Sequence, residues 1–187
     1  MLVGTFTDGS TSKGIYLYKF NQETGLASKT AVMGEIDQPT YVTASDNGKF
    51  RYTVVENSDG KQGVSAFERS GKASDVLRLI NTQSTMDEKS AEENGKGKND
   101  GSGPCFIFTN GKYIITANYG GGDISVFPIN KNTGGIEPLN QHFCFKPEAN
   151  GTVSHIHCVR MTPDRKYLIA TDLRQDRIYR SNINHPA

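Results

Sequence analysis

Short apolar runs with period-2 alternation recur along almost the whole chain, and Gly-rich or Asn/Asp-rich turn signals separate them. Such runs are typical of short, half-buried β-strands. No stretch keeps the 3.6-residue period of a helix, so the pattern predicts an all-β chain of about fourteen strands in antiparallel sheets. The runs lie at 2–6, 15–20, 40–44, 50–55, 63–67, 76–80, 105–108, 113–117, 123–129, 156–161, 167–171 and 177–183.

One strand–turn–strand unit occurs three times. Its copies are QPTYVTASDNGKFRYTVVEN at 38–57, GPCFIFTNGKYIITANYGGG at 103–122 and HIHCVRMTPDRKYLIATDL at 155–173. In each copy a two-residue turn precedes a lysine and an aromatic residue. The lysines are 63 residues apart (Lys49 to Lys112) and then 54 residues apart (Lys112 to Lys166). Repeats of roughly this length with four strands each are typical of β-propeller blades.

The repeat divides the chain into a partial β-propeller of about three and a half blades. The expected blades are 1–36, 39–82, 103–146 and 155–187. The first begins at its second strand, and the fourth lacks its outer strand. Unpaired strand edges promote association, so we expect self-association through the open propeller edges.

The segment 84–102, STMDEKSAEENGKGKNDGS, interrupts the repeat. Met86 is its one large apolar side chain, and most of the others are charged or small. Such a composition cannot bury enough apolar surface to order itself, so we expect a mobile surface insertion between two blades.

Charge and hydropathy exclude several kinds of partner. The chain has 21 Lys and Arg residues against 20 Asp and Glu, with no basic stripe, which argues against nucleic-acid binding. No apolar stretch is long enough to cross a membrane. The first ten residues, MLVGTFTDGS, lack an apolar signal-peptide core, which favours the cytoplasm. A removed signal peptide would leave a periplasmic or secreted location open.

The cysteines do not form a recognisable metal or disulfide pattern. Cys105, Cys144 and Cys158 are odd in number and show no CxxC spacing. We therefore expect buried thiols in a reducing compartment, with neither zinc nor a disulfide framework.

Several stretches together resemble the lactonase family of seven-bladed β-propellers. They are VGTFTDGSTSKGIYLYKFNQETG, GVSAFERSGK, GPC, ANYGGGDISVFPI and HIHCVRMTPDRKYLIATDLRQDRIY. The family includes the propeller-type 6-phosphogluconolactonases and the carboxymuconate-lactonizing enzymes. The resemblance covers about half of a family member. It implies that an Arg and a Glu of the family site would lie beyond Ala187, so residues 1–187 alone are expected to be inactive.

Polar residues at the ends of successive second strands form the candidate binding site. Glu56, Asn118, Tyr119 and Asp172 hold these positions, and repeat geometry should bring them to one rim of the channel. There they could orient the hydroxyls of a sugar acid. Alternatively, Asn118 and Asp172 satisfy backbone groups of the turns, as short polar side chains often do.

His155 and His157 lie two residues apart on a predicted inner strand. The pair could bind a metal, but no third ligand has suitable spacing, so no metal is expected. The resemblance maps His157 onto the acid/base residue of the family, and His155 joins the substrate-binding group. Imidazole suits proton transfer because its ordinary pKa lies near neutrality. Arg160 alternates with His157 and is expected to face away from the site.

The resemblance therefore implies hydrolysis of a sugar lactone, with 6-phosphogluconolactone as the expected substrate and no cofactor. His157 would activate water, and backbone amides or an arginine would stabilise the oxyanion. Two alternatives stay open. One is a cyclase acting on a carboxymuconate, which would need a cationic lining. The other is a non-catalytic propeller that binds a ligand or a protein.

Overall fold

The computed structural model describes residues 1–33, 36–56, 61–69, 77–86, 101–145, 149 and 151–183. All regular elements in these ranges are β-strands, which confirms the all-β prediction. None of the described residues forms a helix that is long and apolar enough to cross a membrane. The strands are β1 (Leu2–Val3), β2 (Ile15–Phe20), β3 (Ala27–Met33), β4 (Val42–Ala44), β5 (Phe50–Val55), β6 (Gly63–Arg69), β7 (Leu77–Ser84), β8 (Pro104–Thr109), β9 (Tyr113–Asn118), β10 (Asp123–Pro128), β11 (Gln141–Cys144), β12 (Ile156–Met161), β13 (Tyr167–Asp172) and β14 (Arg177–Asn182).

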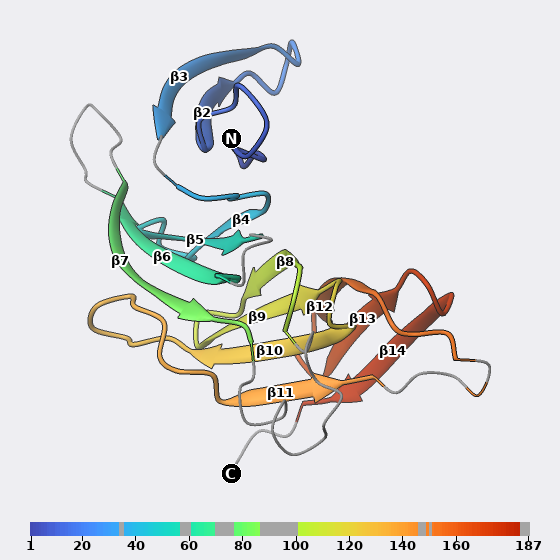
Figure 1. Cartoon of the computed structure of the whole chain (residues 1–187). Coiled ribbons are helices and arrows are strands. Elements are labelled where there is room, and N and C mark those ends of the chain that lie inside the picture. The colour runs from blue at the N-terminus through green and yellow to red at the C-terminus, as the bar shows by residue number, and fades with distance from the viewer. Residues whose placement is uncertain are drawn as a thin grey trace.

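The strands form four antiparallel sheets that succeed one another in chain order (Figure 1). The first sheet holds β1–β3, the second β4–β7, the third β8–β11 and the fourth β12–β14, each in sequence order. The strand β8 contacts both β4 and β12, so the first strands of the last three sheets are neighbours. In a propeller these are the innermost strands, and the architecture is that of a partial β-propeller.

The repeated turn is built in the same way in all three copies. The residue before the repeated lysine has a positive φ each time: +67° at Gly48, +85° at Gly111 and +60° at Arg165. The preceding Asn or Asp side chain accepts a hydrogen bond from the lysine backbone N–H, at 2.9, 3.0 and 3.1 Å in chain order. The Asn-Gly signal thus sets the turn locally, and Arg165 adopts the same conformation without glycine's freedom.

Two apolar cores lie between successive sheets. The first joins the second and third sheets through Tyr52, Val54, Ile114 and Phe127, all at most 1% exposed. The second joins the third and fourth sheets and includes Ala117, Ile156, Val159 and Ala170. Along β9, successive side chains enter different cores, since Ile114 joins the first and Ile115 the second, so both faces of the third sheet are buried.

Two parts of the chain differ from the expected pattern. The strands β3 and β11 lie outside the predicted apolar runs, because most of their side chains are exposed. Of the segment 84–102, residues 87–100 lie outside the described residues. Its described ends are packed: Ser84 belongs to β7, and the fully buried Thr85 donates a hydrogen bond of 2.7 Å to the Gly101 carbonyl.

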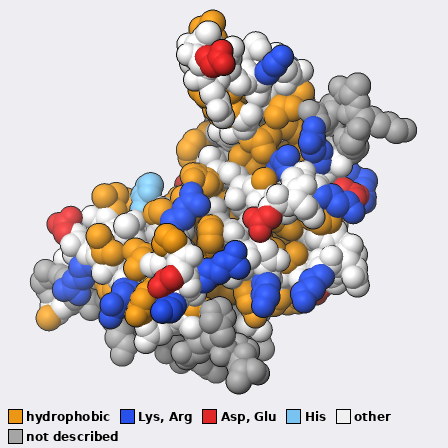
Figure 2. Space-filling view, turned by 180° about the vertical axis from the view of Figure 1, so that it is seen from behind, with side chains coloured by type: hydrophobic (Ala, Val, Ile, Leu, Met, Phe, Trp, Pro, Cys, Tyr) orange, Lys and Arg blue, Asp and Glu red, His pale blue; other side chains and the backbone are white. Residues whose placement is uncertain are grey.

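Apolar and charged side chains are interspersed on the face shown in Figure 2, and the basic side chains there do not form a single stripe. Large apolar side chains that remain exposed include Leu173 and Ile178 of the fourth sheet, at 59% and 72%. Exposed apolar groups of this size on a sheet face mark a surface that another protein element can cover.

Candidate functional site

A β-bulge sets the position of His157. The pairing of β12 with β13 shifts between Ile156 and Cys158, so His157 is the additional residue on β12. A bulge interrupts the alternation of a strand and re-aims the side chain that it carries. The His157 side chain is exposed, and its ring meets the Tyr119 ring edge-on, with 5.7 Å between the ring centroids.

His155 connects the third and fourth sheets. Its Nδ1 lies 2.6 Å from the Tyr119 carbonyl oxygen, and its Nε2 lies 3.0 Å from Nη1 of Arg174. A carbonyl only accepts and a guanidinium only donates, so Nδ1 carries the hydrogen and Nε2 accepts. The Tyr119 ring also stacks on the imidazole, with centroids 4.3 Å apart and planes at 16°. His155 is therefore held rigidly, with both ring nitrogens engaged by protein groups.

Asp172 organises the backbone around this histidine. Its carboxylate accepts hydrogen bonds from Ser154 Oγ (2.6 Å) and from the backbone N–H groups of His155 (3.0 Å), Arg174 and Gln175 (both 3.1 Å). Burial would raise the pKa of Asp172, but these hydrogen bonds together outweigh it and lower the pKa. Asp172 is 3% exposed. Its carboxylate accepts hydrogen bonds from backbone N–H groups of the turn after β13 and of the residue just before β12, and this is one of the two roles expected for it.

A depression of about 400 Å³ runs from His157 across the open face of the fourth sheet. Its lining includes the apolar side chains of Leu173 and Ile178 and the charged side chains of Asp176 and Arg177. Ala170 and Tyr179, which alternate with these residues, pack instead toward the third sheet. The sequence gives no sign that Asp176 and Arg177 would line a depression beside His157. They lie at the start of the third strand of the fourth sheet, which in a propeller is farther from the axis than the strand of His157.

Glu56 lies near the third sheet and acts on Cys105. Its Oε2 accepts a 2.7 Å hydrogen bond from Thr40 Oγ1. Burial, followed by the negative charge of Glu56, raises the pKa of the Cys105 thiol to about 12. The pairing of β8 with β9 shifts around Cys105, just as that of β12 with β13 shifts around His157. Cys105 thus lies close to both candidate residues, since its Sγ is also 3.7 Å from the His157 carbonyl oxygen.

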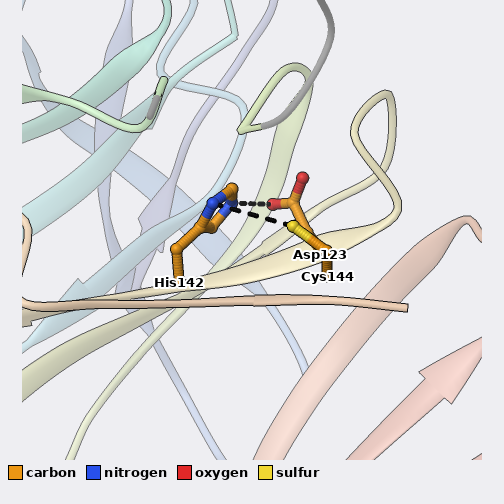
Figure 3. A group of neighbouring side chains, drawn as sticks. All are labelled: Asp123, His142 and Cys144. Atoms are coloured by element: carbon orange, nitrogen blue, oxygen red, sulfur yellow. Dashed lines mark hydrogen bonds and ion pairs between the residues drawn. The ribbon is translucent and has the colours of Figure 1, made fainter. Parts of the chain in front are cut away.

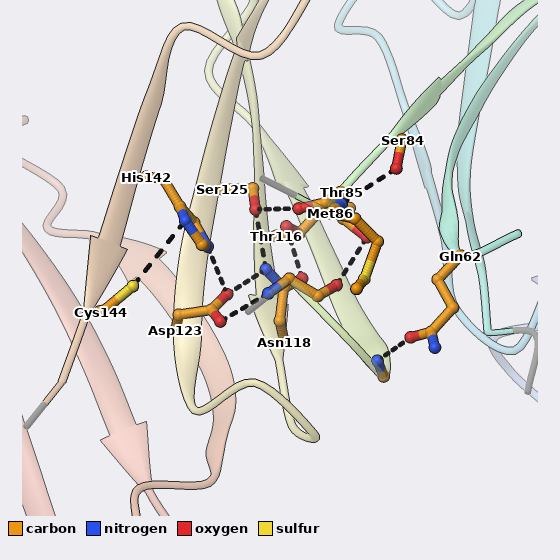
Figure 4. A network of polar contacts seen from close by, with 12 residues as sticks. Gln62, Ser84, Thr85, Met86, Thr116, Asn118, Asp123, Ser125, His142 and Cys144 are labelled. Atoms are coloured by element: carbon orange, nitrogen blue, oxygen red, sulfur yellow. Dashed lines mark hydrogen bonds and ion pairs between the residues drawn. The ribbon is translucent and has the colours of Figure 1, made fainter. Parts of the chain in front are cut away.

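Asn118 belongs to a separate, buried network (Figure 4). Its Nδ2 donates to Asp123 Oδ1 (2.5 Å) and Ser125 Oγ (2.8 Å), and its Oδ1 accepts from Thr116 Oγ1 (2.9 Å). The side chain is 0% exposed. The expectation that Asn118 presents its amide to a substrate does not fit this position, because its polar atoms are bonded to side chains of its own strand and of β10.

Arg160 contacts residues of the innermost strands. Its guanidinium lies over the Phe106 ring, 4.9 Å from the centroid, and Nη2 lies 3.5 Å from the Tyr41 hydroxyl oxygen. Both neighbours belong to or adjoin the innermost strands β8 and β4. The bulge at His157 interrupts the alternation from which Arg160 was expected to face away from the site, and that expectation stays a prediction.

The fold and this rim together define a class of protein. Successive antiparallel sheets with adjacent innermost strands form part of a β-propeller, and the rim carries an exposed histidine beside aromatic, acidic and guanidinium groups. Propellers place binding and catalytic groups around their central axis. The observed group can therefore bind a small polar molecule and exchange a proton with it.

Comparisons with known proteins identify the family. Residues 1–187 match the family described as lactonase, 7-bladed β-propeller. The crystal structure of a proposed 6-phosphogluconolactonase from Bacteroides fragilis has 44% identity and a TM-score of 0.80, over 98% of this chain and 48% of that chain. The 6-phosphogluconolactonase of Bacillus subtilis is 29% identical over 181 residues, which are 95% of this chain and 47% of the relative.

An uncharacterized Staphylococcus epidermidis protein is 34% identical over 182 residues, 94% of this chain and 48% of that relative. The chain belongs to the lactonase family of seven-bladed β-propellers, and it spans about half the length of the relatives it matches. The family resemblance expected from the sequence is confirmed.

Proposed function

We propose that this chain takes part in the hydrolysis of a sugar lactone, with 6-phosphogluconolactone as the substrate. The family match over residues 1–187 supports the reaction class, and the names of the Bacillus and Bacteroides relatives support the substrate. The observation that carries the proposal is the exposure of His157 at the rim. A bulge in β12 sets the direction of its side chain, and the ring lies against Tyr119.

His157 acts as the general base. An imidazole nitrogen accepts a proton from a water molecule, and the resulting hydroxide adds to the lactone carbonyl carbon. The ring C–O bond then breaks, and the imidazolium returns the proton to the departing alkoxide. Backbone amides or a nearby arginine stabilise the charge on the carbonyl oxygen during these steps.

The other rim residues bind and position. Glu56 and the Tyr119 hydroxyl orient sugar hydroxyls, while His155 holds Tyr119 in place. Arg177, which lines the depression beside His157, supplies positive charge for the phosphate. Asp172 and Asn118 contribute indirectly, since both side chains are buried and hold the backbone of the rim. No metal or organic cofactor enters the proposed reaction.

A chimera provides the test, because the chain spans about half of its relatives. Residues 1–187 are joined to the C-terminal half of the Bacteroides fragilis protein, the 44% identical relative. Acid release from 6-phosphogluconolactone is followed in a pH-stat. We expect the chimera to be active and residues 1–187 alone to be inactive. His157→Gln should lower the catalysed rate by roughly 10²–10⁴, the usual contribution of a general base.

Controls separate the alternatives. Asp164→Asn changes a surface carboxylate in the turn before β13 and should leave the rate unchanged. Carboxymuconolactone serves as the substrate of the cyclase alternative. An active chimera with unchanged turnover after His157→Gln would remove His157 from the mechanism. A folded chimera without lactonase activity that binds sugar acids would instead favour the non-catalytic alternative.

A further inference from the structure

Three side chains of the third sheet form a compact group (Figure 3). Cys144 Sγ lies 3.8 Å from His142 Nδ1, and His142 Nε2 lies 3.0 Å from Asp123 Oδ1. Cys144 pairs directly with Asp123 across β10 and β11. His142 lies two residues before Cys144 on β11 and therefore shares its face of the sheet.

The hydrogen-bonding roles in this group follow from its chemistry. His142 Nε2 lies at ion-pair distance from Asp123 Oδ1 but is not hydrogen-bonded to it. A carboxylate repels a nitrogen lone pair, so the hydrogen of the neutral imidazole is placed on Nε2. In a neutral imidazole the other nitrogen then has a lone pair, and Nδ1 presents it to the Cys144 thiol. The S–H group donates to Nδ1. The order is nucleophile, base and orienting carboxylate, as in enzymes that activate a cysteine.

Neighbouring strands fix the carboxylate end of the group (Figure 4). Asp123 is 0% exposed and accepts hydrogen bonds from the Gly101 backbone N–H (2.7 Å) and from Asn118 Nδ2 (2.5 Å). The His142 side chain is 6% exposed, whereas Cys144 is exposed. The base and its orienting group are thus shielded from water while the thiol meets the solvent. Cys144 also departs from the expectation that all three thiols are buried.

A metal ion is the other chemistry that this set of donors could serve. One donor atom of each side chain lies within 4.8 Å of the others. A metal, however, requires donors that converge on one point and uses one nitrogen of an imidazole. Here each imidazole nitrogen faces a different neighbour, Nδ1 the thiol and Nε2 the carboxylate. No single ring nitrogen faces both groups, which favours proton transfer over metal binding.

We propose that Cys144 is a nucleophilic thiol, activated by His142 and Asp123, and is a site of covalent modification by small, soft carbon electrophiles. The thiol proton moves from Sγ to His142 Nδ1. The thiolate then attacks the electrophilic carbon; with a haloacetamide, the C–S bond forms as the carbon–halogen bond breaks and halide leaves. The proton on His142 passes to water. Neither an oxidant nor a metal is required.

Two other cysteines provide internal references. The Cys105 thiol has a pKa raised to about 12, mainly by burial, and donates weakly to the carbonyl oxygens of Ala117, Ile156 and His157. Cys158 is half-buried against the core between the third and fourth sheets. Thiolates, not thiols, react with soft electrophiles, so Cys105 should be nearly inert in the folded protein.

The test measures alkylation rates of all three cysteines by iodoacetamide at pH 7 in EDTA, using mass spectrometry of peptides from a protease that cleaves after glutamate, because Glu148 separates Cys144 from Cys158. The same rates measured in urea give the reactivity of each cysteine in the unfolded chain, where the thiol is fully exposed and Cys144 no longer contacts His142. An ordinary thiol is a few per cent thiolate at pH 7, so activation should make folded Cys144 about tenfold faster than unfolded Cys144. Exposure alone cannot raise the folded rate above the unfolded one.

His142→Gln should remove that advantage while circular dichroism and the rates of Cys105 and Cys158 stay unchanged. Asp123→Asn serves as the second variant, and the expected result is a partial loss. A folded Cys144 no faster than the unfolded one would overturn the proposal. Ordinary reactivity in EDTA, together with stoichiometric protection of Cys144 by added Zn²⁺, would assign the group to metal binding and would also overturn it.

Discussion

Replacing Asp172 with alanine tests how the rim is held together. The change removes the acceptor of four hydrogen bonds, from Ser154 Oγ and from the N–H groups of His155, Arg174 and Gln175. The Ser154 hydroxyl can rotate to another acceptor, and Arg174 is exposed enough for water to replace the carboxylate. The His155 and Gln175 amides have less access to water and would be left without their acceptor.

The magnitude rests on these two amides. An unsatisfied buried donor costs about 1–3 kcal/mol, so Asp172→Ala should lower the free energy of unfolding by about 3 kcal/mol. Asp172→Asn keeps one side-chain oxygen acceptor and should cost about half as much. Because the His155 amide lies next to the bulge, the alanine variant should also loosen His157, and its effect on activity should exceed that of the asparagine variant.

The pH dependence has a definite sign. The folded-state pKa of Asp172 is lowered below its ordinary value of 3.8, so its carboxylate contributes full stability above that value. The contribution is lost as pH falls through the lowered folded-state pKa. The difference in unfolding free energy between the wild type and Asp172→Asn should therefore be constant from pH 8 to about pH 5 and shrink below about pH 4.

Urea denaturation followed by fluorescence and circular dichroism at several pH values measures both effects. Asp164→Asn is the matched control, because Asp164 also has a pKa lowered by hydrogen bonds from Thr162 and Lys166 but lies at the surface. A loss below about 1 kcal/mol for Asp172→Ala would show that water satisfies the amides. A wild-type advantage over Asp172→Asn that persists unchanged at the lowest pH would contradict the assignment of the lowered pKa to the carboxylate.

Three further changes test the packing and the surface. Gly122→Ala should cost about 2–4 kcal/mol in urea denaturation, because φ is +67° and a Cβ would lie 2.3 Å from the Ser154 oxygen. Arg165→Gly should raise the melting temperature, because glycine adopts the φ of +60° without strain. This relief should exceed the cost of the greater entropy of the unfolded chain by about 0.5–1 kcal/mol. An unchanged melting temperature would show that the turn is unstrained. Ile178→Lys should weaken self-association in sedimentation velocity, because Ile178 is 72% exposed on the open sheet face. Equal sedimentation of both proteins would place any association elsewhere.

The strands and turns of the repeat could be predicted from the sequence because their signals are local. Alternation along a strand records which side chains face a core, and an Asn-Gly pair specifies a positive φ wherever it occurs. The all-β class and the propeller architecture followed from three copies of one such unit. The strands β3 and β11 escaped prediction because their mostly exposed side chains give no alternation.

The contacts of the candidate residues required the tertiary structure. Asn118 and Asp172 end equivalent strands, yet one bonds side chains of adjoining strands and the other bonds a turn backbone. Their difference depends on which strands and loops pack beside them. A single bulged residue at 157 also interrupts the alternation of β12, and its position depends on the pairing with β13.

The sequence by itself therefore determined the repeated unit, the turn conformations and the family. The tertiary structure decided that His157 is exposed, that His155 is hydrogen-bonded between two sheets, and that Cys144 lies beside His142 and Asp123. Asp123 and Cys144 face each other only through the register of β10 with β11. Register between strands depends on the packing of whole faces and on the connecting loop, so no local pattern around either residue encodes the contact.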